Sequence, residues 1–403
     1  MNLRPQAAIP LAAAFVLTTL LTSSVPVAGQ STETETRYLS GHGKDDAVEW
    51  EFRVSEGRRA GVWTTIPVPS NWELQGFGTY NYGHDDPKAD EIGRYRHRFD
   101  VPASWRDRHV EIVFGGAMTD AEVWINGTRA GPTHQGGFYR FSYDVSELLH
   151  PGAENLLEVE VAKMSSNASV NSAEREADFW VFGGIYRPVF LNAYPREHIE
   201  RLAVDARHDG TLHVALALAR GPEPRATSVT ARVLDANGEE TAELTRQIGP
   251  SDAEIVLQDV VQGVEAWSPE FPERYTLSVE LEGPEGVVHR TSERIGFRTI
   301  EVRPRDGIYL NGVKVRLKGV NRHSFWPDAG RTTSRAVSEM DVQAMKAMNM
   351  NAVRMSHYPP DKHFLEVTDS LGLLVIDELT GWQGRLRHGG RNLTRARAHR
   401  ARS

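Results

Sequence analysis

Polar residues able to bind or activate a substrate stand at the ends of two short apolar runs in the last quarter of the chain. Asn321 and His323 follow the first run, and Arg354 and His357 follow the second. The parallel strands of an α/β barrel present their chemistry in this way, with packed strand bodies and polar side chains at the carboxyl-terminal rim. We therefore expect these donors and acceptors to gather at one rim of a parallel sheet.

A helix is predicted between these two runs. Ser338 is placed to cap its first turn, and Asp341, three residues later, completes the pattern of a capping box. Apolar residues recur at helical spacing, which predicts one buried stripe along the helix. The stripe consists of Met340, Ala344 and Met348.

A second helix and a third strand are predicted to follow. Pro360 suits a first helical position, and Gly372 suits the end of the helix. The apolar face of this helix consists of Phe364, Val367 and Leu371. The continuous apolar run 373–376 is typical of a parallel strand covered on both faces. The stretch 315–378 is thus predicted to be strand, helix, strand, helix and strand.

Residues 38–195 have an all-β pattern. Leu157, Val159 and Val161 alternate with glutamates, which predicts a half-buried strand. Asn126-Gly127 follows another strand-like run and is a strong hairpin signal. These patterns predict a β-sandwich.

Aromatic residues are dense in this first region, and most of them are interpreted as the filling of the sandwich core. Asp178 and Trp180 could instead belong to a carbohydrate-binding surface. Sugar C–H faces stack on aromatic rings, while sugar hydroxyls need polar partners. The sequence leaves a buried and a rim position equally open for this pair.

Residues 196–300 form a second all-β region. Val229, Ala231 and Val233 alternate with other residues, and Asn237-Gly238 marks a hairpin turn. About a hundred residues of short strands and turns predict an immunoglobulin-like sandwich. No cluster in this region suggests chemistry, so we interpret it as a spacer.

Composition excludes several classes of function. The 403 residues suffice for two or three domains, and the net charge of −8 provides no basic surface for nucleic acid. The chain has no cysteine, which excludes disulfides, thiolate catalysis and cysteine-based zinc sites.

The first 30 residues resemble a secretory signal peptide. Arg4 precedes the apolar stretch 9–21, and small residues at 27–29 suit a cleavage site. The apolar stretch is short for a membrane span. We expect a secreted or periplasmic protein that is not held in a membrane after the signal is removed.

Several longer motifs carry a resemblance to a known family. They are Gly-Val-Asn-Arg-His at 319–323, Asn-Ala-Val-Arg-Met-Ser-His-Tyr-Pro at 351–359 and Gly-Leu-Leu-Val-Ile-Asp-Glu at 372–378. Pro-Ser-Asn-Trp at 69–72, Asp-Phe-Trp at 178–180 and Trp-Ser-Pro at 267–269 add support. In this order they resemble glycoside hydrolase family 2, the group of β-galactosidases, β-glucuronidases and β-mannosidases.

The resemblance implies a multidomain fold: a jelly-roll-like all-β sandwich, an immunoglobulin-like β-sandwich and the first three βα units of a truncated TIM (β/α)8 barrel. The expected divisions are a signal peptide at 1–30, a sugar-binding sandwich at 31–195, an immunoglobulin-like sandwich at 196–300, the barrel part at 301–384 and an Arg-rich tail at 385–403.

The resemblance also implies a sugar site. Arg354 and His357 on the second strand and His323 after the first would line it, while Asp178 and Asn81 would reach in from the first domain. Asp, Asn, His and Arg offer the acceptors and donors that sugar hydroxyls require. The implied partner is an oligosaccharide or polysaccharide, and no cofactor is expected.

The catalytic pair is expected to lie beyond this chain. By the resemblance, hydrolysis retains configuration and uses two carboxylates about 5 Å apart, both glutamates on later barrel strands. Asp377 and Glu378 are adjacent on a strand, so they should point to opposite sides and cannot flank one bond. We expect one of them in the barrel interior or beside a binding residue. The galactosidase-type metal ligands are missing after Glu378, so no metal is expected.

The tail and the incomplete barrel leave two classes of function open. From residue 384 arginines dominate, which predicts a disordered tail and suggests a shifted reading frame. Three strands of a barrel leave an unpaired edge, so we expect this part to be marginally stable and prone to aggregation. The chain is therefore either the N-terminal half of an exported retaining glycosidase or a catalytically inactive carbohydrate-binding fragment. The sequence does not identify the sugar.

Overall fold

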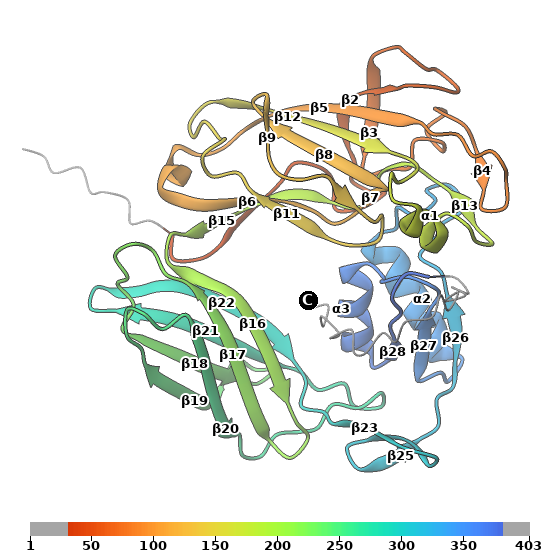
Figure 1. Ribbon diagram of the computed structural model, residues 1–403. Coiled ribbons are helices and arrows are strands. Elements are labelled where there is room, and N and C mark those ends of the chain that lie inside the picture. The colour runs from red at the N-terminus through yellow and green to blue at the C-terminus, as the bar shows by residue number, and fades with distance from the viewer. Residues whose placement is uncertain (1–30, 382–403) are drawn as a thin grey trace, which may run out of the picture. The chain divides into compact units, whose positions relative to one another are not determined.

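The computed structural model describes residues 31–381 (Figure 1). The expected signal peptide and Arg-rich tail lie outside the described residues. Three regions follow one another along the chain: a first sandwich, a second sandwich and a segment of parallel β/α structure, which we call the barrel segment. The multidomain fold class expected from the sequence is confirmed.

The first sandwich consists of two antiparallel sheets. One sheet has the order β1 (Glu35–Tyr38), β15 (Val189–Pro195), β6 (Arg108–Phe114) and β11 (Phe141–Asp144). The other has the order β10 (His134–Gln135), β8 (Asp120–Ile125), β12 (Glu154–Ala162), β5 (Ile92–Asp100), β2 (Val48–Val54) and β3 (Thr64–Val68), with β9 (Thr128–Arg129) on β8.

The alternation of buried and outward-facing residues along its strands explains this sandwich. Leu157, Val159 and Val161 of β12 are buried, as predicted, and the glutamates between them pair with arginines of β5. The predicted hairpin at Asn126-Gly127 is confirmed, because both residues have positive φ and join β8 to β9. The remaining elements are η1 (Ala103–Asp107), α1 (Ala168–Glu174), and the short pairs β4 (Asn81–Tyr82) with β13 (Trp180–Val181) and β7 (Ala117–Met118) with β14 (Gly184–Ile185).

The second sandwich packs a three-stranded sheet against a four-stranded one. The first contains β16 (His198–Ala206), β17 (Thr211–Ala219) and β20 (Glu254–Val260). The second contains β19 (Glu240–Gln247), β18 (Ser228–Leu234), β21 (Tyr275–Gly283) and β22 (Gly286–Ile295). The alternating residues Val229, Ala231 and Val233 are fully buried, as their pattern predicted.

The barrel segment contains three parallel strands, β26 (Gly319–Arg322), β27 (Ala352–Met355) and β28 (Leu374–Ile376). Helices α2 (Arg335–Ala347) and α3 (Lys362–Leu371) connect them. Within residues 31–381 these strands do not close into a barrel. The predicted first strand at 315–323 is divided, because β25 (Val313–Val315) belongs to an antiparallel ribbon with β23 (Ile300–Arg303) and β24 (Gly307–Leu310).

Two expectations for α2 are wrong. The N-cap is Ser334, whose side chain accepts a hydrogen bond from the Val337 amide, and Ser338 is buried inside the helix. The exposed fractions of Met340 and Met348 are 48% and 61%, so they do not form a buried stripe. The buried residues are Val337, Ser338, Val342 and Met345.

Helix α3 follows its predicted pattern more closely. Phe364 and Val367 are buried, and Gly372 caps the helix with φ of 77°. The helix starts after Asp361 rather than at Pro360. Strand β28 is covered less than expected, since Ile376 is 43% exposed.

Gly372 should be sensitive to substitution. A Cβ there would lie 2.3 Å from the Pro269 carbonyl oxygen, whereas Gly238 has a similar positive φ and no atom within 4 Å of such a Cβ. We expect Gly238→Ala to cost about 1 kcal/mol of unfolding free energy through backbone strain alone. Gly372→Ala should cost roughly 2–4 kcal/mol, because overpacking is added. Urea unfolding of both variants checks this, and equal losses would contradict the contact with Pro269.

Candidate functional site

Three side chains at the carboxyl ends of the parallel strands form one polar cluster. The Arg354 Nε donates to Glu378 Oε1 at 2.6 Å, and His357 Nδ1 lies 3.0 Å from Glu378 Oε2. Arg354 pairs with Ile376 in the sheet register, which places Glu378 at the same rim. Burial raises the pKa of Glu378, but the hydrogen bonds from Arg354 and His357 outweigh it, and the pKa lies below its ordinary value. Glu378 is therefore a carboxylate that orients two basic side chains.

His323 joins this cluster from the loop after β26. Its ring centroid lies 5.6 Å from that of His357, and its Nδ1 lies 3.2 Å from the Tyr358 hydroxyl. Burial lowers the pKa of His323 to about 4, and the charges of Arg331 and His357 act in the same direction. At neutral pH the ring is therefore uncharged and offers one donor and one acceptor, which suits a hydroxyl.

The charge state of His323 can be tested directly. We expect its ring protons to titrate near pH 4 in a nuclear magnetic resonance experiment, with His323→Asn identifying the signal. Because the unfolded chain holds this proton up to about pH 6.5, His323 should reduce the stability of the fold as the pH falls from 6.5 to 4. A midpoint near 6.5 would show that water reaches the ring freely.

Asp178 lies just before β13 of the first sandwich. Its carboxylate is 56% exposed and lies 2.7 Å from the His84 Nε2. The next residue, Phe179, packs edge-on against Tyr358 at 6.4 Å between ring centroids, and the Arg331 guanidinium lies over both rings. Since Tyr358 also holds His323, the structure brings the Asp178 segment into the neighbourhood of the rim cluster.

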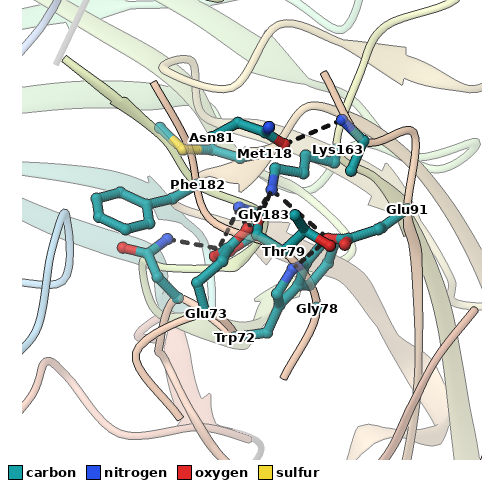
Figure 2. A network of polar contacts seen from close by, with 12 residues as sticks. Trp72, Glu73, Gly78, Thr79, Asn81, Glu91, Met118, Lys163, Phe182 and Gly183 are labelled. Carbon is teal, nitrogen blue, oxygen red and sulfur yellow. Dashed lines mark hydrogen bonds and ion pairs between the residues drawn. The ribbon is translucent and has the colours of Figure 1, made fainter. Parts of the chain in front are cut away.

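Asn81 is placed differently from the other expected sugar-binding residues. Only 7% of it is exposed, and its side-chain oxygen accepts a hydrogen bond from the Ala89 amide at 2.9 Å. Figure 2 shows its side chain among the buried groups around Lys163 and Met118. The structure therefore does not bring Asn81 to the surface that carries Asp178.

Asp377 and Glu378 separate as neighbours on an extended chain should. Glu378 contacts Arg354 and His357, whereas Asp377 lines a different hollow with Arg298 and Asp369. Burial raises the pKa of Asp377, and the charge of Glu378 adds to the effect. In the part of the chain that the structure describes, no group of three or more His, Asp or Glu side chains could hold a metal ion.

Sequence reasoning missed Tyr358 and Arg331. Tyr358 stacks on Phe138 at 4.3 Å between ring centroids, and Arg331 is 3% exposed above the Phe138, Phe179 and Tyr358 rings. Tyr358 follows His357 directly, so its place at the end of a parallel strand was a usable signal. Arg331 lies in an irregular loop, where no period indicates the direction of a side chain.

Family models match the three regions in order. Residues 45–195 match the sugar binding domain of glycosyl hydrolases family 2, residues 197–298 match the family 2 model, and residues 300–390 match the family 2 TIM barrel domain.

Curated relatives include two β-galactosidases. That of Priestia megaterium is 33% identical over 344 residues, which cover 78% of this chain and 32% of the relative. That of Thermoanaerobacter pseudethanolicus is 31% identical, over 72% of this chain and 40% of the relative. A putative β-glucuronidase of Formosa agariphila is 28% identical, over 80% of this chain and 39% of the relative. The chain thus spans between about a third and two fifths of these relatives.

Solved structures agree in fold. The β-glucuronidase of Ruminococcus gnavus in complex with D-glucuronic acid matches with a TM-score of 0.70 and 24% identity, over 87% of this chain and 61% of that chain. At this identity the likeness concerns the fold alone. Because three successive models of one family match in order and together cover most of the sequence, the chain belongs to family 2 of the glycosyl hydrolases.

Proposed function

We propose that this chain provides the N-terminal, sugar-binding part of an exported, retaining glycosidase that hydrolyses O-glycosidic bonds in oligosaccharides or polysaccharides. We also propose that the 403-residue chain binds its sugar without cleaving it. A terminal β-galactoside or β-glucuronide is the proposed ligand, because relatives carry those names. The basic start and apolar stretch within the first 30 residues support export.

The observation that carries this proposal is the rim cluster. Arg354 and His357 are held by Glu378, and His323 is held by Tyr358, so donors and acceptors point from fixed positions. Fixed polar groups bind a polar ligand well because little ordering is needed on binding. Asp178 adds an exposed carboxylate directly before Phe179, whose ring packs on Tyr358.

The contacts of Glu378 and of Asp178 argue against cleavage of a sugar by these two carboxylates. Both oxygens of Glu378 are engaged by basic side chains, and its lowered pKa removes the proton that an acid would donate. Asp178 is paired with His84. A retaining glycosidase needs one protonated and one ionised carboxyl group about 5 Å apart. We therefore assign these two residues to binding and orientation.

Calorimetry tests the proposed sugar binding, and a chromogenic assay tests the proposed absence of hydrolysis. Methyl β-D-galactoside and methyl β-D-glucuronide are titrated into the full chain, and hydrolysis of the 4-nitrophenyl β-glycosides is followed. We expect binding of at least one sugar, loss of that binding in Arg354→Ala, and no hydrolysis. Arg303→Ala is the matched control, because Arg303 forms a similar exposed pair with Glu301 away from the rim.

Each outcome bears on one part of the proposal. Equal binding by the Arg354 and Arg303 variants would exclude the rim cluster as the sugar site. Hydrolysis that disappears in Glu378→Gln would overturn the assignment of Glu378 to orientation. Export is checked by N-terminal sequencing of protein recovered outside the cytoplasm, where an intact Met1 would contradict removal of a signal.

A further inference from the structure

A small ribbon of the first sandwich presents aromatic rings to solvent. Trp180 of β13 pairs with Tyr82 of β4, and Tyr80 precedes β4. The Trp180 ring lies 5.5 Å from Tyr82 and 5.9 Å from Tyr80 between centroids, in edge-on contacts. Trp180 is 45% exposed and Tyr80 is 41% exposed, whereas most aromatic residues of this sandwich are buried or half-buried. We call these three residues the aromatic ribbon.

Hydrogen-bonding side chains surround the aromatic ribbon. The exposed Asp178–His84 pair stands beside Trp180 in the chain, and the Arg58 guanidinium lies 4.9 Å from the Tyr80 ring centroid. Ring faces suit the C–H faces of a pyranose, while the Asp178 carboxylate and the His84 imidazole suit its hydroxyls. A purely apolar partner would strip water from the exposed Asp178–His84 pair, which is costly, whereas the Arg58 guanidinium already donates to the carbonyl oxygens of Glu73, Phe77 and Gly78.

The aromatic ribbon is continuous with the proposed sugar site. Asp178 is two residues before Trp180, and Phe179 between them packs on Tyr358, which holds His323. We propose that Trp180 and Tyr80 form a second sugar position, which binds the next residue of a carbohydrate chain whose terminal residue occupies the rim cluster. This inference rests on the proposed function, and it assigns an oligosaccharide or polysaccharide, rather than a monosaccharide, as the ligand.

A buried ionic network holds both ends of the aromatic ribbon. The Lys163 Nζ donates to the carbonyl oxygen of Thr79, next to Tyr80, and lies 2.9 Å from Glu73 Oε1. The Glu73 carboxylate accepts the Gly183 amide at 3.0 and 3.1 Å, three residues after Trp180. Figure 2 shows Lys163 reaching both Glu73 and Thr79. The backbone that carries the rings is therefore held in place by buried contacts, which reduces the ordering needed when a sugar binds.

Calorimetric titration of the full chain tests the second position. The probes are methyl β-D-galactoside, a β-1,4-linked galactobiose and the matching trisaccharide, with the corresponding β-glucuronides as a second series. Trp180→Ala should leave binding of the methyl glycoside unchanged and weaken binding of the longer probes by about tenfold. Trp180→Phe keeps a ring and should restore most of that loss.

Trp63→Ala is the matched control. Trp63 directly precedes β3, is 37% exposed, and lies against Arg53 of β2 and Arg96 of β5 in the larger sheet of the first sandwich. This variant should bind every probe as the unaltered chain does. If Trp63→Ala weakens binding and Trp180→Ala does not, the second position lies on that sheet and the inference is overturned.

Binding of the methyl glycoside reports on the rim cluster alone, and binding of the longer probes also reports on the second sugar position. If no probe binds the unaltered chain, or if Arg354→Ala leaves binding of the methyl glycoside unchanged, the rim cluster is not a sugar site and both proposals fail. If the methyl glycoside binds through Arg354 but longer probes bind no more tightly, or are indifferent to Trp180→Ala, only the second position is excluded.

Discussion

Replacing Lys163 with methionine is expected to lower the free energy of unfolding of the first sandwich by about 3–5 kcal/mol. The side chains of Lys163, Glu73 and Glu91 are all fully buried. The ammonium lies 2.9 Å from Glu73 and 3.5 Å from Glu91, so one cation serves two carboxylates (Figure 2). Methionine fills similar space but leaves both carboxylates without a counter-charge in a dry core.

The loss of unfolding free energy in the Lys163→Met protein should depend on pH. Burial raises the pKa of Glu73 to about 7, against the opposing charge of Lys163. An acid whose pKa rises on folding stabilises the fold fully below its unfolded pKa, and that contribution is lost as the pH rises toward 7. Without Lys163 this pKa should rise further. The Lys163→Met protein should therefore be less impaired at pH 5, where Glu73 can take up a proton, than at pH 8.

Hydrogen exchange of the amides in β5 and β12 measures this effect at the two pH values. Lys314→Met is the matched control, because the Lys314 ammonium pairs with Asp306 at the surface. An exposed pair contributes little, so the control should unfold almost as the unaltered chain does at either pH. Equal exchange in the Lys163 variant and in the unaltered chain would show that Glu73 is already neutral in the folded protein.

The sandwiches were predictable because one rule governs them. In β12 and β18 every second residue enters a core, so alternation gives both the strand and the face that it buries. The turn at Asn126-Gly127 needs positive φ at both positions, which few residues other than Asn and Gly accept. These signals are local, so they did not depend on the rest of the fold.

Helix α2 was harder because it carries two apolar sets. Met340 and Met348 occupy one side and Val342 and Met345 another, and helical spacing alone permits either set to be buried. The choice follows from the strands beneath, where Val342 and Met345 pack in one cluster with Val353. The N-cap was predicted at Ser338 for the same reason, whereas the structure places it at Ser334.

In the candidate site, too, some residues could be predicted from the sequence and others could not. His323, Arg354 and Glu378 are at strand ends, so their common rim followed from the order of strands. The burial of Asn81 did not, because it depends on a loop that folds back to place the Ala89 amide beside it. Contacts between distant loops, such as Phe179 with Tyr358, carry no periodic signal in a single sequence.

Asp361→Ala should be the other strongly destabilising substitution. Arg187 and Asp361 are 2.6 Å apart, and their side chains are 9% and 7% exposed. Burial raises the pKa of Asp361, but the charge of Arg187 outweighs it, so the pKa lies below its ordinary value. Removing the carboxylate leaves the guanidinium buried and uncompensated, which should cost about 3–5 kcal/mol. The same pair should weaken in acid, as the pH falls through the pKa of Asp361.

This pair joins β15 and its preceding loop to the start of α3. Arg187 also donates to the Pro359 carbonyl, two residues beyond His357, and Asp361 accepts from the Thr333 hydroxyl. Loss of the carboxylate should therefore release the barrel segment before either sandwich unfolds. We expect limited proteolysis to cut residues 319–378 first in the Asp361→Ala protein, and binding of methyl β-D-galactoside or methyl β-D-glucuronide to weaken in parallel.

The double variant Arg187→Met with Asp361→Leu separates charge from packing. It removes both buried charges at once and replaces them with side chains of similar bulk, which is often nearly neutral. If the double variant resists the protease as the unaltered chain does, the uncompensated guanidinium caused the loss. If it is cut as fast as Asp361→Ala, the hydrogen bonds to Pro359 and Thr333 hold the barrel segment, and the ion pair is secondary. In both cases we expect sugar binding to change together with protease resistance, because His357 and Tyr358 directly precede Pro359, whose carbonyl oxygen accepts from Arg187.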